Sequence, residues 1–270
     1  MTSTDPRSIE PTGPAAPPAA TSVKSADRTV DILELLASSP QRMTLSELQR
    51  SLGVPKSSLH GLLQTLVARG WVETDERNLA YAIGLRALRI GAAYLERDPV
   101  IEAAGPLLTQ LRNELNETVH LARLDGSDIV YLASRESAHH LRSSSRIGRR
   151  LPAHATALGK VLLAVRDEKA VDALLPDRLQ ALTPDTVTDR SELKAELAEA
   201  RAAGFSYEQG QNTPGLGCFA VAVAGRQPAV DSLSCSVPLI RLNEEHRQQI
   251  IAALVEAADE IGHLTRRAGW

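Results

Sequence analysis

Three short helical patterns, with a tight turn between the second and third, constrain the fold of this chain most. Thr44 and Glu47 have the spacing of a capping box, in which two side chains bond each other's backbone N–H groups at the start of a helix. That helix is expected to end near Gly53. Pro55 suits the first turn of the next helix, whose aliphatic stripe continues to Gly70. The pattern predicts a helix-turn-helix unit.

Two strand patterns follow the helices, at residues 71–73 and 79–83, on either side of a charged turn. Helices followed by a two-stranded ribbon are typical of a winged helix-turn-helix, in which the helix after the turn enters the major groove of duplex DNA. The candidate DNA-binding residues are Arg28, Thr44, Lys56, Ser57, Ser58, His60, Gln64 and Arg77.

The start of the third helix carries the side chains that suit DNA. Serine hydroxyls bond phosphates or base edges, and Lys56 adds a charge whose binding to phosphate releases counterions. An alternative interpretation, in which Ser57 and Ser58 only cap or solvate the helix, stays open. Residues 24–97 contain ten Lys or Arg and eight Asp or Glu, a net charge of +2. The pattern, more than the charge, therefore favours DNA binding.

The composition excludes several other classes of protein. A formal charge of −3 over 270 residues excludes a wholly basic nucleic-acid binder. The 3% aromatic content argues against a stacking platform for single strands. Two cysteines are too few for a disulfide scaffold, and no apolar run reaches membrane-spanning length. The chain also lacks the apolar stretch of a secretory signal. We therefore expect a cytoplasmic protein that does not enter a membrane.

Four segments are expected along the chain. A proline-rich tail at residues 1–23 is predicted to be disordered. Residues 24–83 form the winged helix-turn-helix, and residues 84–115 form linker helices that break near Asp98. Residues 116–268 mix strand and helix patterns, which indicates a second, α+β domain. Leucines at positions 85, 88, 107 and 111 need apolar partners, so we expect a homodimer or homotetramer joined through the linker helices.

The chain resembles the IclR-type bacterial transcriptional regulators from about residue 24 to about residue 266. The similar segments are SADRTVDILELL (25–36), VPKSSLH (54–60), LQTLVARG (63–70), GRRLPAHATALGK (148–160), LTPDT (182–186) and GLGC (215–218). The resemblance implies a GAF-like effector-binding domain behind the winged helix. Gly61 stands where the family usually has an arginine, so a presumed phosphate contact lacks its side chain.

A small carboxylate is the expected ligand of the second domain. Thr156 can cap a helix whose first N–H groups favour an anion. Ser234 and Ser236 alternate along a strand and share one face, which is either a pocket wall, as the resemblance implies, or a solvated sheet surface. The candidate effector-binding residues are Leu151, His154, Thr156, Ala157, Glu208, Cys218, Ser234 and Ser236.

The predicted function is a transcriptional repressor, not an enzyme, whose affinity for operator DNA changes when a small organic acid binds. The alternative is a small-molecule hydrolase that pairs Cys218 with His154. A cysteine redox sensor would need a lowered thiol pKa, which no adjacent cation suggests. A glycine-rich stretch at residues 215–220 leads into a strand and therefore does not form a dinucleotide cradle. The histidines lack ligand spacing, so neither a metal nor a cofactor is expected.

Overall fold

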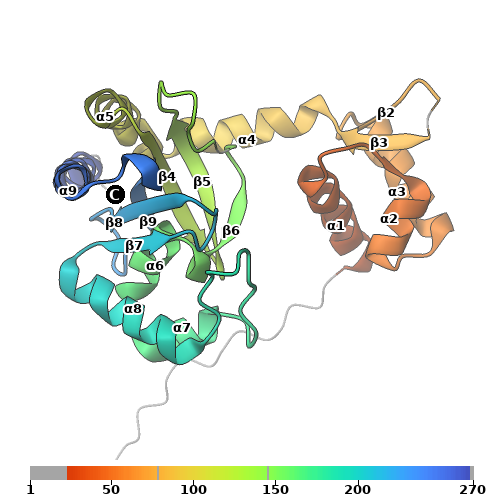
Figure 1. Cartoon of the computed structure of the whole chain (residues 1–270). Helices are drawn as coiled ribbons and strands as arrows, with labels where there is room; N and C mark the ends of the chain where they lie inside the picture. Colours follow the sequence, from red (N-terminus) through yellow and green to blue (C-terminus); the bar gives the residue numbers. More distant parts are fainter. Residues whose placement is uncertain (1–22, 78, 145, 268–270) are drawn as a thin grey trace, which may run out of the picture. The chain divides into compact units, whose positions relative to one another are not determined.

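The structure is a computed structural model, and it describes residues 23–77, 79–144 and 146–267. The expectation for the proline-rich tail concerns residues outside this part, apart from Val23. The chain divides into two compact units between Ala92 and Ala93. Both units combine helices with an antiparallel sheet (Figure 1), so the predicted α+β class is confirmed.

The first unit is a winged helix-turn-helix. Its elements are α1 (Lys24–Ser38), β1 (Met43–Thr44), α2 (Leu45–Leu52), α3 (Lys56–Ala68), β2 (Val72–Thr74) and β3 (Ala80–Ile83). The strands pair antiparallel in the order β1-β3-β2. The two helices of the turn are followed by the β2–β3 ribbon, as the sequence pattern predicts.

Local signals set the ends of these helices. The hydroxyl of Thr44 accepts the N–H of Glu47 at 3.3 Å, and the Glu47 carboxylate accepts the N–H of Thr44 at 2.7 Å, which confirms the capping box. Gly53 ends α2 with φ +64°, a left-handed conformation that glycine adopts without a Cβ penalty. α1 begins at Lys24 after Val23, so Ser25 lies inside its first turn.

A small aliphatic core holds the first unit together. Its three helices have 15, 8 and 13 residues, lengths at which an isolated helix is marginal in water. Burial of one face of each helix therefore supplies their stability. The buried residues of this core are Ile32, Leu36, Leu48, Val54, Leu59, Leu63, Leu66, Val72 and Tyr81.

The boundary between the two units lies within α4 (Leu85–Arg97), and the second unit contains a six-stranded antiparallel sheet of order β6-β5-β4-β9-β8-β7. Its elements are α5 (Pro99–Leu115), β4 (Thr118–Asp125), β5 (Asp128–Arg135), β6 (Arg150–Pro152), η1 (Ala153–Ala155), α6 (Ala157–Ala164), α7 (Glu168–Leu174), α8 (Arg190–Ala203), β7 (Ser206–Gln209), β8 (Leu216–Ala222), β9 (Asp231–Pro238), η2 (Leu239–Arg241) and α9 (Glu244–Arg267). No helix in the described ranges is long and apolar enough to cross a bilayer.

Helices cover both faces of this sheet (Figure 1). α5 and α9 pack on one face, and α6, α7 and α8 lie on the other. Alternation along β9 sends Leu233, Cys235 and Val237 into the core beneath α5 and α9. Ser234 and Ser236 therefore face the opposite side, beside α6.

The expected linker at residues 84–115 differs from the structure, because α5 belongs to the second unit. Four of its leucines pack in the core of that unit: Leu107, Leu108, Leu111 and Leu115. Leu107 and Leu111 thus find apolar partners within their own chain, contrary to the expectation that they await a second copy. α4 is the part of the expected linker that stays exposed.

Candidate functional site

The α3 helix presents a polar face. Leu59 and Leu63 are fully buried in the first unit, and His60 and Gly61 between them are exposed. The exposed side chains include Ser57, His60 and Gln64, which recur at intervals of three and four residues. This spacing places them on one side of a helix, where they can reach the base edges of a groove.

Two of the predicted DNA-binding residues contact each other. Arg28 on α1 donates a hydrogen bond to the Ser58 hydroxyl at 3.2 Å, and both side chains are half-buried. Ser58 therefore faces α1, whereas its neighbour Ser57 is exposed. Thr44 caps α2 and is engaged with Glu47, so its hydroxyl has a structural partner. The exposed Lys56 lies at the start of α3, and the exposed side chain of Arg77 lies in the turn between β2 and β3.

Six of the eight predicted effector-binding residues line one pocket in the second unit. The pocket encloses about 320 Å³, including its open mouth. The six residues come from the start of α6 and from β7, β8 and β9: Thr156, Ala157, Glu208, Cys218, Ser234 and Ser236. The sheet face that carries the two serines is therefore a pocket wall and not a solvated surface.

The pocket has a donor end at α6. The Thr156 hydroxyl accepts the N–H of Gly159 at 3.0 Å and so caps the helix. The first N–H groups of a helix have no partner within it, and the first two residues of α6, Ala157 and Leu158, line the pocket. Together with the hydroxyls of Ser234 and Ser236, they form a group of donors suited to an anion.

Leu151 and His154 lie outside this pocket. Leu151 is on β6 and packs in the core between the sheet and α6. His154 lies in η1, is 1% exposed, and its Nε2 is 3.0 Å from the carbonyl oxygen of Gln180. Both residues are close in sequence to the start of α6, but neither lines the cavity.

The pocket also includes residues that sequence reasoning missed. They are Tyr131, Ser143, Leu158, Asn212 and Leu216. Leu158 follows the predicted Ala157 directly, so helix geometry signals it. Ser143 and Asn212 lie in loops, whose side-chain direction no period predicts.

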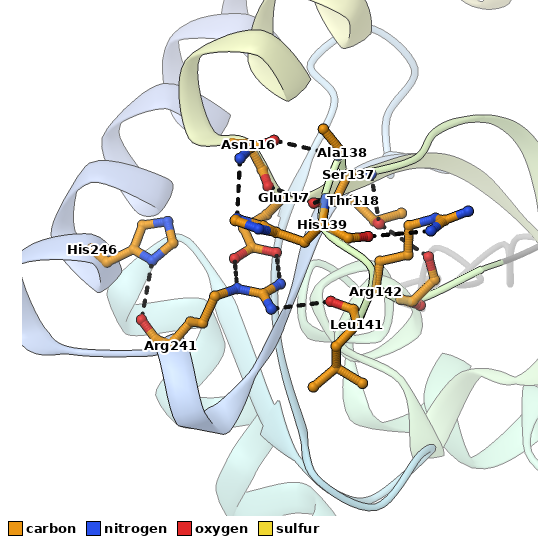
Figure 2. Close-up of polar contacts among 11 residues, drawn as sticks. Asn116, Glu117, Thr118, Ser137, Ala138, His139, Leu141, Arg142, Arg241 and His246 are labelled. Atoms are coloured by element: carbon orange, nitrogen blue, oxygen red, sulfur yellow. Dashed lines mark hydrogen bonds and ion pairs between the residues drawn. The ribbon is translucent and has the colours of Figure 1, made fainter.

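A hydrogen-bond network holds the loop that brings Ser143 to the pocket (Figure 2). Glu117 is 1% exposed and accepts two hydrogen bonds from Arg241, at 2.7 and 2.6 Å. Arg241 also donates to the carbonyl oxygen of Leu141 at 3.0 Å, and Thr118 donates to that of Ser143 at 3.0 Å. The loop is thus anchored to the start of β4 and to η2.

Comparisons with known proteins agree with both units. The family model described as the IclR helix-turn-helix domain matches residues 25–76, and the bacterial transcriptional regulator IclR C-terminal model matches residues 92–263. This chain belongs to the IclR family of bacterial transcriptional regulators. The predicted family and fold are therefore confirmed.

Several IclR-family proteins are similar over nearly the whole chain. The HTH-type transcriptional regulator BhcR of Paracoccus denitrificans is 33% identical over 243 residues, covering 88% of this chain and 86% of that protein. The transcriptional repressor IclR of Escherichia coli is 32% identical over 252 residues, covering 92% of each. A solved IclR regulator from Alicyclobacillus acidocaldarius superposes with a TM-score of 0.81 at 27% identity, over 90% of this chain and 99% of that one.

Membership of the IclR family makes this chain a ligand-responsive, DNA-binding transcriptional regulator. The hydrolase alternative has no support in the structure. Burial raises the pKa of the Cys218 thiol well above its ordinary value, which disfavours the nucleophilic thiolate. Cys218 lies 3.3 Å from the Ser236 hydroxyl, while His154 points to Gln180. The two members of the supposed pair thus have other partners.

Proposed function

We propose that this chain is a cytoplasmic homodimeric or homotetrameric repressor that binds operator DNA through α3 and changes its affinity when a small organic acid enters the pocket. The observation that carries the proposal is the pocket's donor end, where the α6 N-terminus meets Thr156, Ser234 and Ser236. Because N–H and hydroxyl donors favour an anion, a carboxylate is the chemical group that suits it. The Escherichia coli relative named a repressor supports the direction of control.

The effector prediction is tested by Ser234→Ala with Ser236→Ala. Thermal-shift screening against acetate, glyoxylate, pyruvate, succinate and 4-hydroxybenzoate identifies the carboxylates that bind, since a ligand of the native state raises its stability. In the double variant, calorimetry should show an affinity at least about tenfold lower, because two hydrogen bonds of about 1 kcal/mol each are lost. Operator affinity without effector should match that of the wild type. Unchanged effector affinity would place the ligand elsewhere.

The DNA-contact prediction separates base reading from phosphate binding. Gln64→Ala should reduce discrimination between operator and unrelated duplex by about 1 to 3 kcal/mol, because an exposed amide on α3 is suited to pair with a base edge. Lys56→Ala should weaken binding to every duplex alike. It should also reduce the salt dependence of the DNA affinity by the contribution of about one phosphate contact. Fluorescence anisotropy on duplexes selected from a randomised library, at several salt concentrations, measures both. If both substitutions lowered the affinity for all duplexes equally, the assignment of Gln64 to base reading and Lys56 to phosphate binding would be contradicted.

The oligomer is proposed to form through α4. None of its residues, all of which the structure describes, is buried. Leu85 and Leu88 are 78% and 67% exposed, and Ala92 and Leu95 continue their stripe at heptad spacing. A symmetric pair of such helices buries both stripes. Two winged helices would then read a palindromic operator.

A further inference from the structure

A buried carboxyl group shares the pocket with the donors that suit an anion. Glu208 on β7 is 2% exposed and lines the same cavity as Thr156 and Ser234. One of its oxygens accepts the backbone N–H of Gln211 at 2.8 Å. Cys218 lies directly across from it on β8. Any carboxylate that reaches the α6 end of this small cavity therefore meets a second acid.

The cation that acts on Glu208, Lys160, is not among the described residues that line the pocket. No described lining residue is Lys, Arg or His. The titratable groups whose charge reaches Glu208 are Lys160 on α6, Cys218 on β8, Tyr131 on β5 and Tyr207 on β7. Lys160 forms an ion pair with Glu196 on α8 and donates to the Gln211 side chain at 2.6 Å. The exposed Arg149 acts on Tyr131 from the loop before β6 but does not line the cavity.

We propose that Glu208 takes up one proton from solvent when a carboxylate effector binds, so that effector affinity falls as the pH rises. The inference rests on the proposed effector pocket. Two carboxylates in a small cavity whose described lining carries no cation disfavour each other's ionised form. The effector keeps its charge because the α6 N–H groups and the hydroxyls solvate it, and the proton goes to Glu208.

The surroundings of Glu208 favour this outcome. Burial raises the pKa of Glu208 in the free protein, although hydrogen bonds from Cys218 and from the Gln211 N–H and the charge of Lys160 oppose it. A bound carboxylate raises that pKa further. Once protonated, Glu208 also gains an O–H donor that an effector oxygen can accept. The protonated Glu208 and the effector then form a hydrogen bond instead of repelling each other.

The pH dependence follows by linkage. Between the pKa of Glu208 in the free protein and its higher pKa in the complex, the complex holds more protons than the free protein. Affinity therefore falls as the pH rises through this window, by up to about tenfold for each pH unit. Below the free-state pKa, Glu208 is already protonated and the affinity no longer depends on it.

Calorimetry on the full chain tests the proposal with the five carboxylates of the thermal-shift panel. Titrations in Hepes and in Tris, whose ionisation enthalpies differ, count the protons taken up. We expect uptake approaching one proton per carboxylate near neutral pH, and an affinity at least about tenfold lower at about pH 8 than at about pH 6. The amide of the same acid carries no charge and should bind without proton uptake.

Glu208→Gln distinguishes proton coupling from a structural role. The variant keeps an acceptor for the Gln211 N–H but has no charge, so it should lose proton uptake and bind the carboxylate more tightly than the wild type at about pH 8. A purely structural defect would lower affinity at every pH. Glu199→Gln removes an exposed carboxyl of α8 as a matched control and should behave as the wild type.

The possible results separate this proposal from the proposed function. Carboxylate binding to the wild type without proton uptake, at a pH-independent affinity, would overturn the role of Glu208 and leave the effector pocket intact. If none of the five carboxylates binds, the proposed effector class fails, and the proton coupling that depends on it fails too. Because these wild-type measurements need no variant, they decide the matter even where a substitution impairs folding.

Discussion

Replacing Arg123 with alanine is expected to lower the free energy of unfolding of the second unit by about 3 to 5 kcal/mol. Arg123 on β4 contacts two carboxylates that are 8% and 6% exposed, those of Asp98 and Asp231. Its Nε lies 2.6 Å from Asp231, and a second nitrogen donates to the Tyr94 hydroxyl at 2.8 Å. Without the guanidinium, two buried acids face each other with no cation between them.

The pKa values of the two aspartates are shifted in opposite directions. Burial acts to raise both pKa values, but in Asp98 the hydrogen bonds and charge of Arg123 outweigh it, so the pKa of Asp98 is lowered. In Asp231 burial outweighs Arg123, and its pKa is raised. Loss of Arg123 removes from both carboxylates the hydrogen bonds and the positive charge that favour their ionised forms. Asp98 also caps α5 through the N–H groups of Val100 and Ile101, so the start of that helix is affected as well.

Arg150→Ala supplies the matched control. Arg150 also contacts two aspartates, Asp125 and Asp128, but its side chain is 50% exposed. Water screens such pairs, so this substitution should cost less than about 1 kcal/mol. Urea unfolding of both variants, followed by circular dichroism, measures the difference. Equal losses of unfolding free energy for Arg123→Ala and Arg150→Ala would show that burial does not determine how strongly an arginine–aspartate network stabilises the fold.

Leu85→Glu together with Leu88→Glu should separate the proposed dimer and weaken operator binding by about 100-fold to 10,000-fold. A monomer loses the second half-site, and with it the high effective concentration that linked binding supplies. Glutamate in an apolar helix pair would also bury unpaired charge. Light scattering measures the mass, and fluorescence anisotropy measures binding to the palindromic operator and to a half-site.

Binding to a half-site distinguishes loss of the dimer from damage to the DNA-binding helix. A folded double variant should retain the wild-type affinity for the half-site, because α3 is unchanged. Arg86→Gln with Arg97→Gln changes the net charge of α4 by the same amount but leaves the leucine stripe, so its mass should match the wild type. An unchanged mass for the leucine variant would rule out α4 as the interface.

Features that depend on neighbouring residues were predictable from the sequence. The capping box of Thr44 with Glu47 and the left-handed Gly53 follow from backbone geometry over a few residues. The placement of Ser234 and Ser236 on one face follows from the two-residue period of a strand, which tertiary contacts do not alter. β6 has 3 residues, which are too few to show a period by themselves, and it was missed.

The sequence by itself determined the winged helix-turn-helix, the strand faces and the family, because capping, turn and periodic signals act locally and the family segments stand in order along the chain. Only the tertiary structure decided which distant side chains meet. It joined Arg123 to Asp231 across 108 residues and turned Ser58 toward Arg28. It also excluded His154 from the pocket, because side-chain direction at a loop or helix junction depends on packing against segments far away in sequence.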